Sequence, residues 1–143
     1  MRTLQNSAHQ VLGIAENDIC LSAAKLYFAY GLANPPGDVE RTAAAFAAAR
    51  DRLSKGLAAE GYAVLPAEGT YFLSLDLTAS GISADDVTFC ERAVREAGIA
   101  AIPVSAFYAE APVTSVVRLC FAKQDETLQA GIERLGRARM LFG

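Results

Sequence analysis

The fold is decided by residues 50–77, which read RDRLSKGLAAEGYAVLPAEGTYFLSLDL. Their first part completes an amphipathic helical pattern that begins at Asp38, the expected N-cap residue, and ends at Gly61. Two strands joined by a turn follow, predicted over 62–65 and 70–77, and alternate residues of the second strand point to opposite faces. A helix followed by a β-hairpin is therefore expected.

The pattern continues with a second helix, two strands and a closing helix. Ser83 and Asp86 form a variant capping box for the second helix, which runs to Gly98. The remaining expected segments are strands over 99–103 and 115–122, a loop over 105–114 and a helix from about Asp125. The order α-β-β-α-β-β-α predicts an α+β fold (an α/β sandwich), with a small, mostly antiparallel or mixed sheet covered by helices.

The chain is expected to divide into two parts. Residues 38–143 form the predicted domain, and residues 1–37 form a separate N-terminal segment. Within that segment the apolar run from Ser22 to Leu32, in which Lys25 is the one charged residue, favours a helix. The adjacent prolines at 35 and 36 mark the boundary.

Composition excludes several classes of function. The 143 residues are 52% apolar and carry a net charge of −3, which is typical of one globular domain and gives no basic face for nucleic acid. No apolar run approaches the roughly 20 residues of a membrane-spanning helix, and no secretory signal is visible, so we expect no membrane association and a cytoplasmic location. The chain has one histidine, His9, and three widely spaced cysteines, expected to be buried free thiols, so no metal site is predicted.

Three stretches resemble one enzyme family. Residues 50–77, residues 85–108 (DDVTFCERAVREAGIAAIPVSAFY) and residues 116–135 (VVRLCFAKQDETLQAGIERL) are similar to the C-terminal small domain of class I/II, fold-type I aminotransferases, over about residues 50–142. The resemblance implies pyridoxal phosphate (PLP) as the cofactor of the parent family and an amino acid or keto acid as substrate. It also implies that Arg118 binds the substrate α-carboxylate. Val104 departs from the pattern, because the family has glycine there, and this puts the backbone of the following loop in question.

The residues around Arg118 support a binding role independently. Arg118 shares a strand face with Val116 and Cys120, and neither face of that strand is properly polar. A guanidinium in such a place needs a partner, and a planar carboxylate matches its geometry. Asp76, a backbone carbonyl or solvent are the alternative partners. Tyr71 and Tyr108 are candidates to reach a ligand near Arg118, although tyrosines in a hairpin or a loop are more often packing residues.

The opening segment carries a second resemblance. Residues 11–34, VLGIAENDICLSAAKLYFAYGLAN, resemble a stretch of benzoate and hydroxybenzoate CoA ligases that lines their aryl-acid pocket. The ligases' phosphate-binding loop and catalytic lysine region are absent, so adenylation is not expected. A competing, loose alignment fits Ser22, Lys25, Tyr27 and Gly31 to the spacing around the aminotransferase lysine that forms the Schiff base with the cofactor. Lys25 is then the candidate catalytic residue; the alternative is a lysine whose stem packs while its ammonium reaches water.

We expect this chain by itself not to catalyse transamination. A transaminase also needs an aspartate at the pyridine nitrogen and a phosphate site, and neither is identifiable here. Three functions remain open: a small domain that binds the substrate carboxylate, a non-catalytic domain that forms a homodimer, and a binder of small carboxylates or aryl acids. No PLP is expected to bind to this chain alone.

Overall fold

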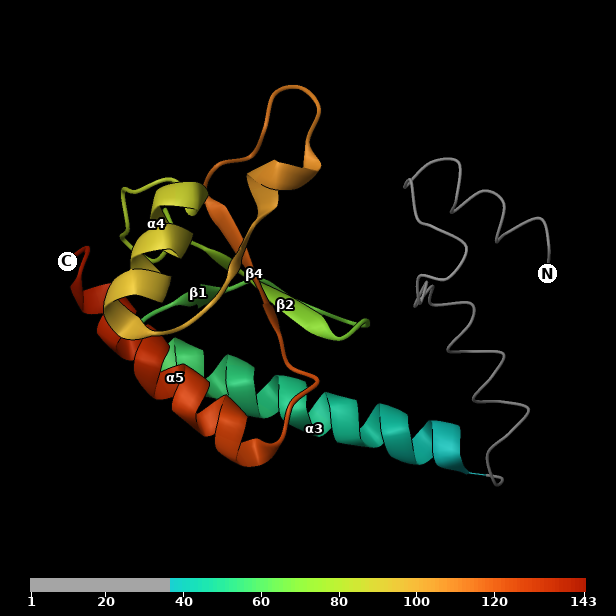
Figure 1. Cartoon of the computed structure of the whole chain (residues 1–143). Coiled ribbons are helices and arrows are strands. Elements are labelled where there is room, and N and C mark those ends of the chain that lie inside the picture. Colours follow the sequence, from blue (N-terminus) through green and yellow to red (C-terminus); the bar gives the residue numbers. More distant parts are fainter. Residues whose placement is uncertain (1–36) are drawn as a thin grey trace, which may run out of the picture. The chain divides into compact units, whose positions relative to one another are not determined.

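The computed structural model describes residues 37–143 (Figure 1). The contacts within the chain group residues 43–143 into one compact unit. The elements in chain order are α3 (Asp38–Ala59), β1 (Ala63–Val64), β2 (Phe72–Asp76), α4 (Asp86–Arg92), the π-helix η1 (Ala93–Ala97), β3 (Ile102–Pro103), the 3-10 helix η2 (Val104–Phe107), β4 (Val116–Cys120) and α5 (Asp125–Met140). Helices and one small sheet give the α+β class that the sequence predicts. The expected N-terminal helix over Ser22–Leu32 lies outside the described residues.

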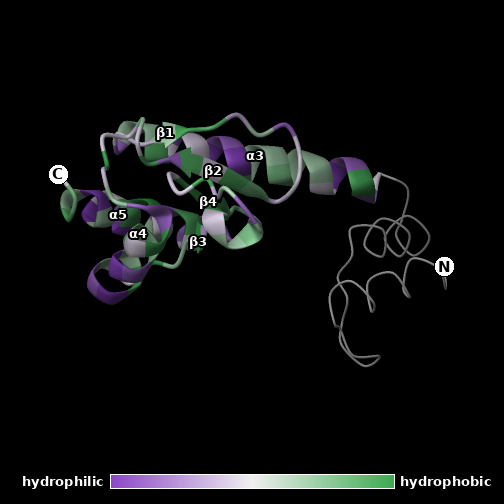
Figure 2. Ribbon diagram, turned by 90° about the horizontal axis from the view of Figure 1, so that it is seen from above, coloured by the Kyte–Doolittle hydropathy of each residue, from purple (hydrophilic) through white to green (hydrophobic). Residues whose placement is uncertain are grey.

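The four strands form one sheet in the order β1-β2-β4-β3. All its pairings are antiparallel, so the sheet is not mixed. One face of the two central strands supplies the core residues Leu73, Leu75, Val117 and Leu119, which are buried together with apolar residues of all three α-helices. Hydrophilic and hydrophobic stretches alternate along α4 and α5 (Figure 2).

The other face, which we call the outer face, remains partly exposed. The alternate residues of β2 and β4 on this face are half-buried, apart from Cys120, which is exposed. The prediction of buried thiols is thus confirmed for Cys90 and wrong for Cys120, and Cys20 lies outside the described residues. Burial, and secondarily the charge of Asp86, raise the pKa of the Cys90 thiol to about 12.

Two predicted helix starts are wrong by a few residues. Helix α3 is capped by Gly37, whose carbonyl accepts the Arg41 N–H, and Asp38 is the first helical residue. Helix α4 is capped by Asp85, whose side chain accepts the Thr88 N–H at 2.7 Å, rather than by Ser83. The sequence pattern did not distinguish the true cap from its neighbour at either start, because Gly37 and Asp38 are adjacent and Ser83 lies two residues before Asp85.

All four strands are shorter than predicted, and the structure shows a specific cause for β2 and β3. Thr70 has a φ of 66°, which interrupts the extended conformation, so β2 starts at Phe72 rather than at residue 70. Strand β3 starts only at Ile102, because the chain closes η1 first: Gly98 is left-handed and the Ile99 N–H bonds the Ala93 carbonyl.

Helices α3 and α5 lie side by side and run in the same direction (Figure 1). Arg52 pairs with Asp125 at the start of α5, and the backbone of Gly56 lies against the Ile132 side chain one to two turns further on. Gly136 likewise lies against the Glu60 side chain. The two glycines therefore let the helices approach closely.

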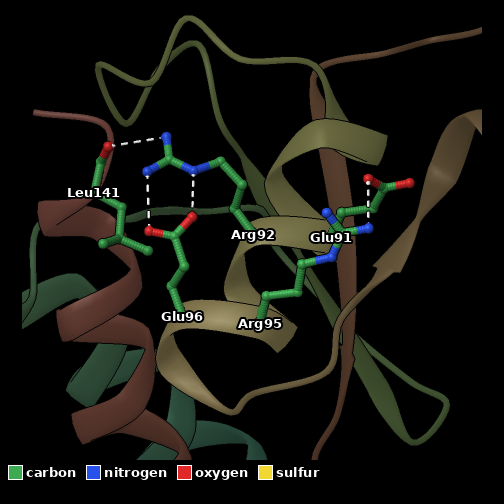
Figure 3. Close-up of polar contacts among 5 residues, drawn as sticks. All are labelled: Glu91, Arg92, Arg95, Glu96 and Leu141. Atoms are coloured by element: carbon green, nitrogen blue, oxygen red, sulfur yellow. Dashed lines mark hydrogen bonds and ion pairs between the residues drawn. The ribbon is translucent and has the colours of Figure 1, made fainter.

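The C-terminal end is fastened to the end of α4. The Arg92 guanidinium bonds both carboxylate oxygens of Glu96 and, at 3.2 Å, the Leu141 carbonyl (Figure 3). The same guanidinium lies over the Phe142 ring at 4.5 Å. Nearby, Arg95 and Glu91 form a looser surface pair at 3.7 Å (Figure 3).

Candidate functional site

Arg118 occupies the middle of β4 on the outer face of the sheet. The antiparallel register places it opposite Ser74 of β2 on one side and opposite Ile102 of β3 on the other. Its neighbours in the chain, Val117 and Leu119, point into the core. The strand thus fixes the backbone of Arg118 while its side chain stays on the half-buried face.

Two phenyl rings lie against the guanidinium of Arg118. Its Cζ is 4.2 Å from the ring centroid of Phe72 and 4.6 Å from that of Phe107. Phe72 comes from the first residue of β2 and Phe107 from the last residue of η2. Stacking of this kind favours the cation electrostatically and holds the guanidinium plane. The rings pack against the guanidinium, and its N–H groups point outward in the guanidinium plane. A carboxylate in that plane can accept two parallel hydrogen bonds.

Arg118 has no protein partner within residues 37–143 for its N–H groups. Over that range its side chain makes neither a hydrogen bond nor an ion pair, whereas the side chains of Arg50, Arg92, Arg134 and Arg139 do. Asp76, the carboxylate proposed as an alternative partner, instead accepts the Ala79 N–H at 2.9 Å. The alternative of an Arg118–Asp76 pair is therefore wrong.

The two predicted tyrosines flank the aromatic pair. Tyr71 is 53% exposed and packs edge-on to Phe72, with 5.5 Å between ring centroids. Tyr108 is 47% exposed and directly follows Phe107. A ligand role for either tyrosine stays a prediction. The residues that contact Arg118 are the phenylalanines, and sequence reasoning missed both.

Alternation along β2 was the signal that could have found Phe72, because it puts Phe72 on the face opposite the buried leucines. Antiparallel pairing of β2 with β4 then brings that face beside Arg118. Phe107 had no comparable signal, since its position depends on the course of an irregular loop. Val104 enters that loop in a 3-10 turn and is not among the residues with positive φ, so valine fits there without strain.

Two surface hollows offer less for an anion. One, of about 300 Å³, follows residues 65–74 and includes Phe72 but not Arg118. The other, of about 590 Å³, lies where α3 meets α5 and is lined by Asp125, Glu126 and Glu133 beside Arg52. Its three carboxylates oppose a negatively charged ligand.

Neither lysine of the described residues is buried. Residues 37–143 contain two lysines, Lys55 and Lys123, and both are exposed. Lys25, the predicted catalytic lysine, lies outside the described residues. In the same range no cluster of side chains is suited to a metal ion, and no helix is long and apolar enough to cross a membrane.

The sequence matches the family model described as aminotransferase class I and II over residues 8–135. It is 46% identical to methionine aminotransferase of Escherichia coli (strain K12) over 86 residues, which are 60% of this chain and 22% of that protein. It is 40% identical to the probable N-succinyldiaminopimelate aminotransferase DapC of Mycobacterium tuberculosis (strain ATCC 25618 / H37Rv) over 97 residues, 62% of this chain and 24% of that protein.

Solved structures agree. N-succinyldiaminopimelate aminotransferase from Mycobacterium tuberculosis superposes with a TM-score of 0.67 at 37% identity, covering 81% of this chain and 33% of that one. YbdL from Escherichia coli, described as having a methionine aminotransferase function, gives a TM-score of 0.60 at 43% identity, covering 64% of this chain and 24% of that one.

The chain spans about a quarter of the length of the curated relatives it matches. The family match starts at residue 8 and so includes residues 11–34; the resemblance of that stretch to CoA ligases is not supported. The match also includes the strand that bears Arg118 and the loop that bears Phe107. On this match, and on the agreement of the fold, the chain belongs to the class I and II aminotransferases, a family whose cofactor is pyridoxal phosphate.

Proposed function

We propose that residues 38–143 form a substrate-binding small domain that takes the α-carboxylate of an amino acid or keto acid on Arg118. The observation that carries the proposal is the state of the guanidinium: it is half-buried, stacked against two phenyl rings, and without a protein partner in the described part of the chain. Membership of the aminotransferase family supports the same ligand class.

The stacked arrangement prepares the guanidinium for its ligand. Phe72 and Phe107 restrict the rotamers of Arg118 before a ligand arrives, so less entropy is lost when two hydrogen bonds form. The site is open to solvent on the outer face, and one charge-assisted pair in such a setting gives weak affinity. We expect dissociation constants of about 1 mM, corresponding to roughly −4 kcal/mol.

The described residues bind and orient the substrate, and they do not carry out the chemistry. In a complete aminotransferase the cofactor supplies the electron sink, and the protein supplies position and charge. Within residues 37–143 the group proposed to supply position and charge is the guanidinium of Arg118, which binds the substrate carboxylate. Lys25 stays a candidate for holding the cofactor: an absorption band that appears on mixing the chain with PLP and is lost in Lys25→Ala would assign it that role, and an unchanged spectrum would remove it.

A ligand titration of three variants tests the carboxylate proposal. Nuclear magnetic resonance (NMR) titrations with amino acids and 2-oxo acids are expected to give saturable shifts around Arg118 in the wild type and none in Arg118→Ala. Arg118→Lys should retain weak binding, because lysine keeps the charge but not the planar pair of donors. Arg95→Ala is the matched control, since Arg95 is an exposed arginine already paired with Glu91. Equal binding by wild type and Arg118→Ala would reject the proposal.

A second function, self-association into a homodimer, is favoured by the apolar residues on and around the outer face. Ile102, Phe107 and Tyr108 are large, exposed and close in sequence, and Ile102 pairs directly with Arg118 in the sheet. Sedimentation over a range of concentrations tests this proposal. A dimer that dissociates in Ile102→Glu would support it, and a strict monomer at high concentration would remove it.

A further inference from the structure

The loop between β3 and β4 begins with η2 and reaches β4 at residue 116, and it projects from the sheet (Figure 1). It carries Phe107, one of the two rings stacked on Arg118. Phe107 is itself 60% exposed, so few contacts of its own hold it in place. The position of the ring therefore depends on how the two ends of the loop are fixed.

Both ends of the loop are fixed by one residue, Asp86. At the entry of the loop, the Asp86 carboxylate accepts the Ser105 N–H at 2.7 Å on Oδ2 and the Ser105 hydroxyl at 2.9 Å on Oδ1. At the exit, the backbone N–H of Asp86 donates to the Thr114 carbonyl at 2.7 Å. Asp86 thus spans the loop from Ser105 to Thr114.

The carboxylate of Asp86 lies in an unusual environment, because it is buried and has no cationic partner in the described part of the chain. Its side chain is fully buried, with 0% exposure, and it makes no ion pair with any of residues 37–143. Burial of a carboxylate is costly unless hydrogen bonds compensate it, and here both come from Ser105. The helix does not require Asp86, because the adjacent Asp85 already caps α4.

The bonds to Ser105 transmit order to Phe107 over a short path. Ser105 lies two residues before Phe107 in the single turn η2, and its carbonyl accepts the Tyr108 N–H at 3.1 Å, which closes that turn around Phe107. Fixing Ser105 therefore fixes the whole turn and the direction in which the Phe107 ring leaves it.

We propose that Asp86 is a positioning residue for the Arg118 site: through Ser105 it holds the turn that places Phe107 against the guanidinium. This extends the proposed carboxylate-binding function, on which its effect on affinity rests. The geometric part does not need any ligand, because the proximity of Phe107 to Arg118 is measurable in the free protein.

Four variants test the proposal, and a fifth, Phe107→Ala, is the reference for loss of the ring. Asp86→Ala removes both hydrogen bonds to Ser105. Ser105→Ala removes only the hydroxyl bond, and it takes the place of Asp86→Ala if that variant does not fold. Asp86→Asn is the conservative variant, because its amide oxygen can accept the Ser105 N–H while its NH₂ donates to the Ser105 hydroxyl oxygen. Asp85→Ala is the matched control: it weakens the cap of the same helix and leaves the Ser105 bonds in place.

Two readouts are measured on each variant. The first is the NMR signal of the Arg118 Nε–H in the free protein, which ring currents shift upfield when the guanidinium lies over phenyl faces. The second is the affinity for a 2-oxo acid. Asp86→Ala is expected to move the Arg118 signal toward that of Phe107→Ala and to weaken binding about two- to fivefold, the contribution of one partly exposed cation–π contact.

Ser105→Ala should shift the signal in the same direction by less, and Asp86→Asn should stay within twofold of the wild type. Asp85→Ala should lower the unfolding temperature without moving the signal. The proposal is overturned if Asp86→Ala, or Ser105→Ala where the first does not fold, leaves the Arg118 signal unchanged, or if Asp85→Ala moves it equally. Failure of carboxylate binding in the wild type would reject the proposed function alone, because the signal of the free protein still decides the role of Asp86.

Discussion

The parallel packing of α3 and α5 makes a sharp prediction for two glycines. A Cβ added at Gly56 would overlap Cδ1 of Ile132 and lie 3.0 Å from its Cγ1. A Cβ added at Gly136 would overlap the carboxylate end of Glu60, with 2.9 Å to its Cδ. The two overlaps look alike but differ in what must move: Ile132 is buried in the core, whereas Glu60 is an exposed side chain that can turn into solvent.

The two substitutions also share a favourable contribution. Alanine in place of glycine inside a helix stabilises it by about 1 kcal/mol. Overlap with a packed core residue costs about 1–3 kcal/mol, and displacing an exposed side chain costs much less. Gly136→Ala should therefore raise the free energy of unfolding by up to about 1 kcal/mol, and Gly56→Ala should lower it by up to about 2 kcal/mol.

Urea denaturation of both variants, followed by circular dichroism, measures these changes. The difference between the two variants is more informative than either value, because the helix-propensity contribution cancels. It should be about 1–3 kcal/mol in favour of Gly136→Ala. Equal stabilisation by the two alanines would show that Gly56 does not face Ile132, and would refute the packing of α3 against α5.

Three further predictions concern titration and buried hydrogen bonds. The pKa of the Cys90 thiol is about 12 in the folded protein against 9.0 in the unfolded chain, so its contribution to stability is present below pH 9 and is lost as the pH rises toward 12. Cys90→Ala should therefore reduce the alkaline fall of the free energy of unfolding, measured in urea, by about 1.4 kcal/mol per pH unit in that range. An unchanged slope would count against burial of the thiol. The Thr88 N–H lowers the pKa of Asp85, so the contribution of the Asp85 carboxylate to stability is present above the unfolded pKa of 3.8 and is lost as the pH falls through the folded value. Asp85→Ala should lower the unfolding temperature at neutral pH by a few degrees and weaken the fall of that temperature in acid. Melting curves that match the wild type at every pH would contradict this. The buried Tyr62 hydroxyl donates to the Leu135 carbonyl at 2.8 Å, so Tyr62→Phe should cost about 1 kcal/mol in chemical denaturation, and no measurable cost would indicate that the bond is absent in solution.

Local patterns in the sequence predicted the parts of the fold that local rules control. The amphipathic stripe of α3 and the alternating leucines of β2 led to a helix and a strand that the structure contains. Strand β3 was overestimated, because the apolar run from Ile99 reads as extended chain although its first residues close the π-helix. The bond from the Ile99 N–H to the Ala93 carbonyl, six residues earlier, is made by the backbone and cannot be predicted from the pattern of side chains.

The site was predictable only in part for a similar reason. Arg118 was found through the resemblance to the aminotransferase family, and its place on a largely apolar strand supported a binding role. The sequence pattern assigned Asp86 to a capping box with Ser83. In the structure the adjacent Asp85 is the exposed cap, and Asp86 is buried and bonds Ser105, 19 residues further along the chain. Which of two adjacent carboxylates faces the core depends on where the helix begins, and the expected start at Ser83 was wrong.

The most direct test of the central claim compares two ligands rather than two proteins. The wild-type chain is titrated with an amino acid and with its primary amide, which has the same side chain and no carboxylate, while the side-chain N–H signals of Arg118 are observed by NMR. We predict saturable shifts of those signals with the acid and none with the amide at the same concentrations. Equal shifts with both ligands, or no shift with either, would contradict a carboxylate site at Arg118.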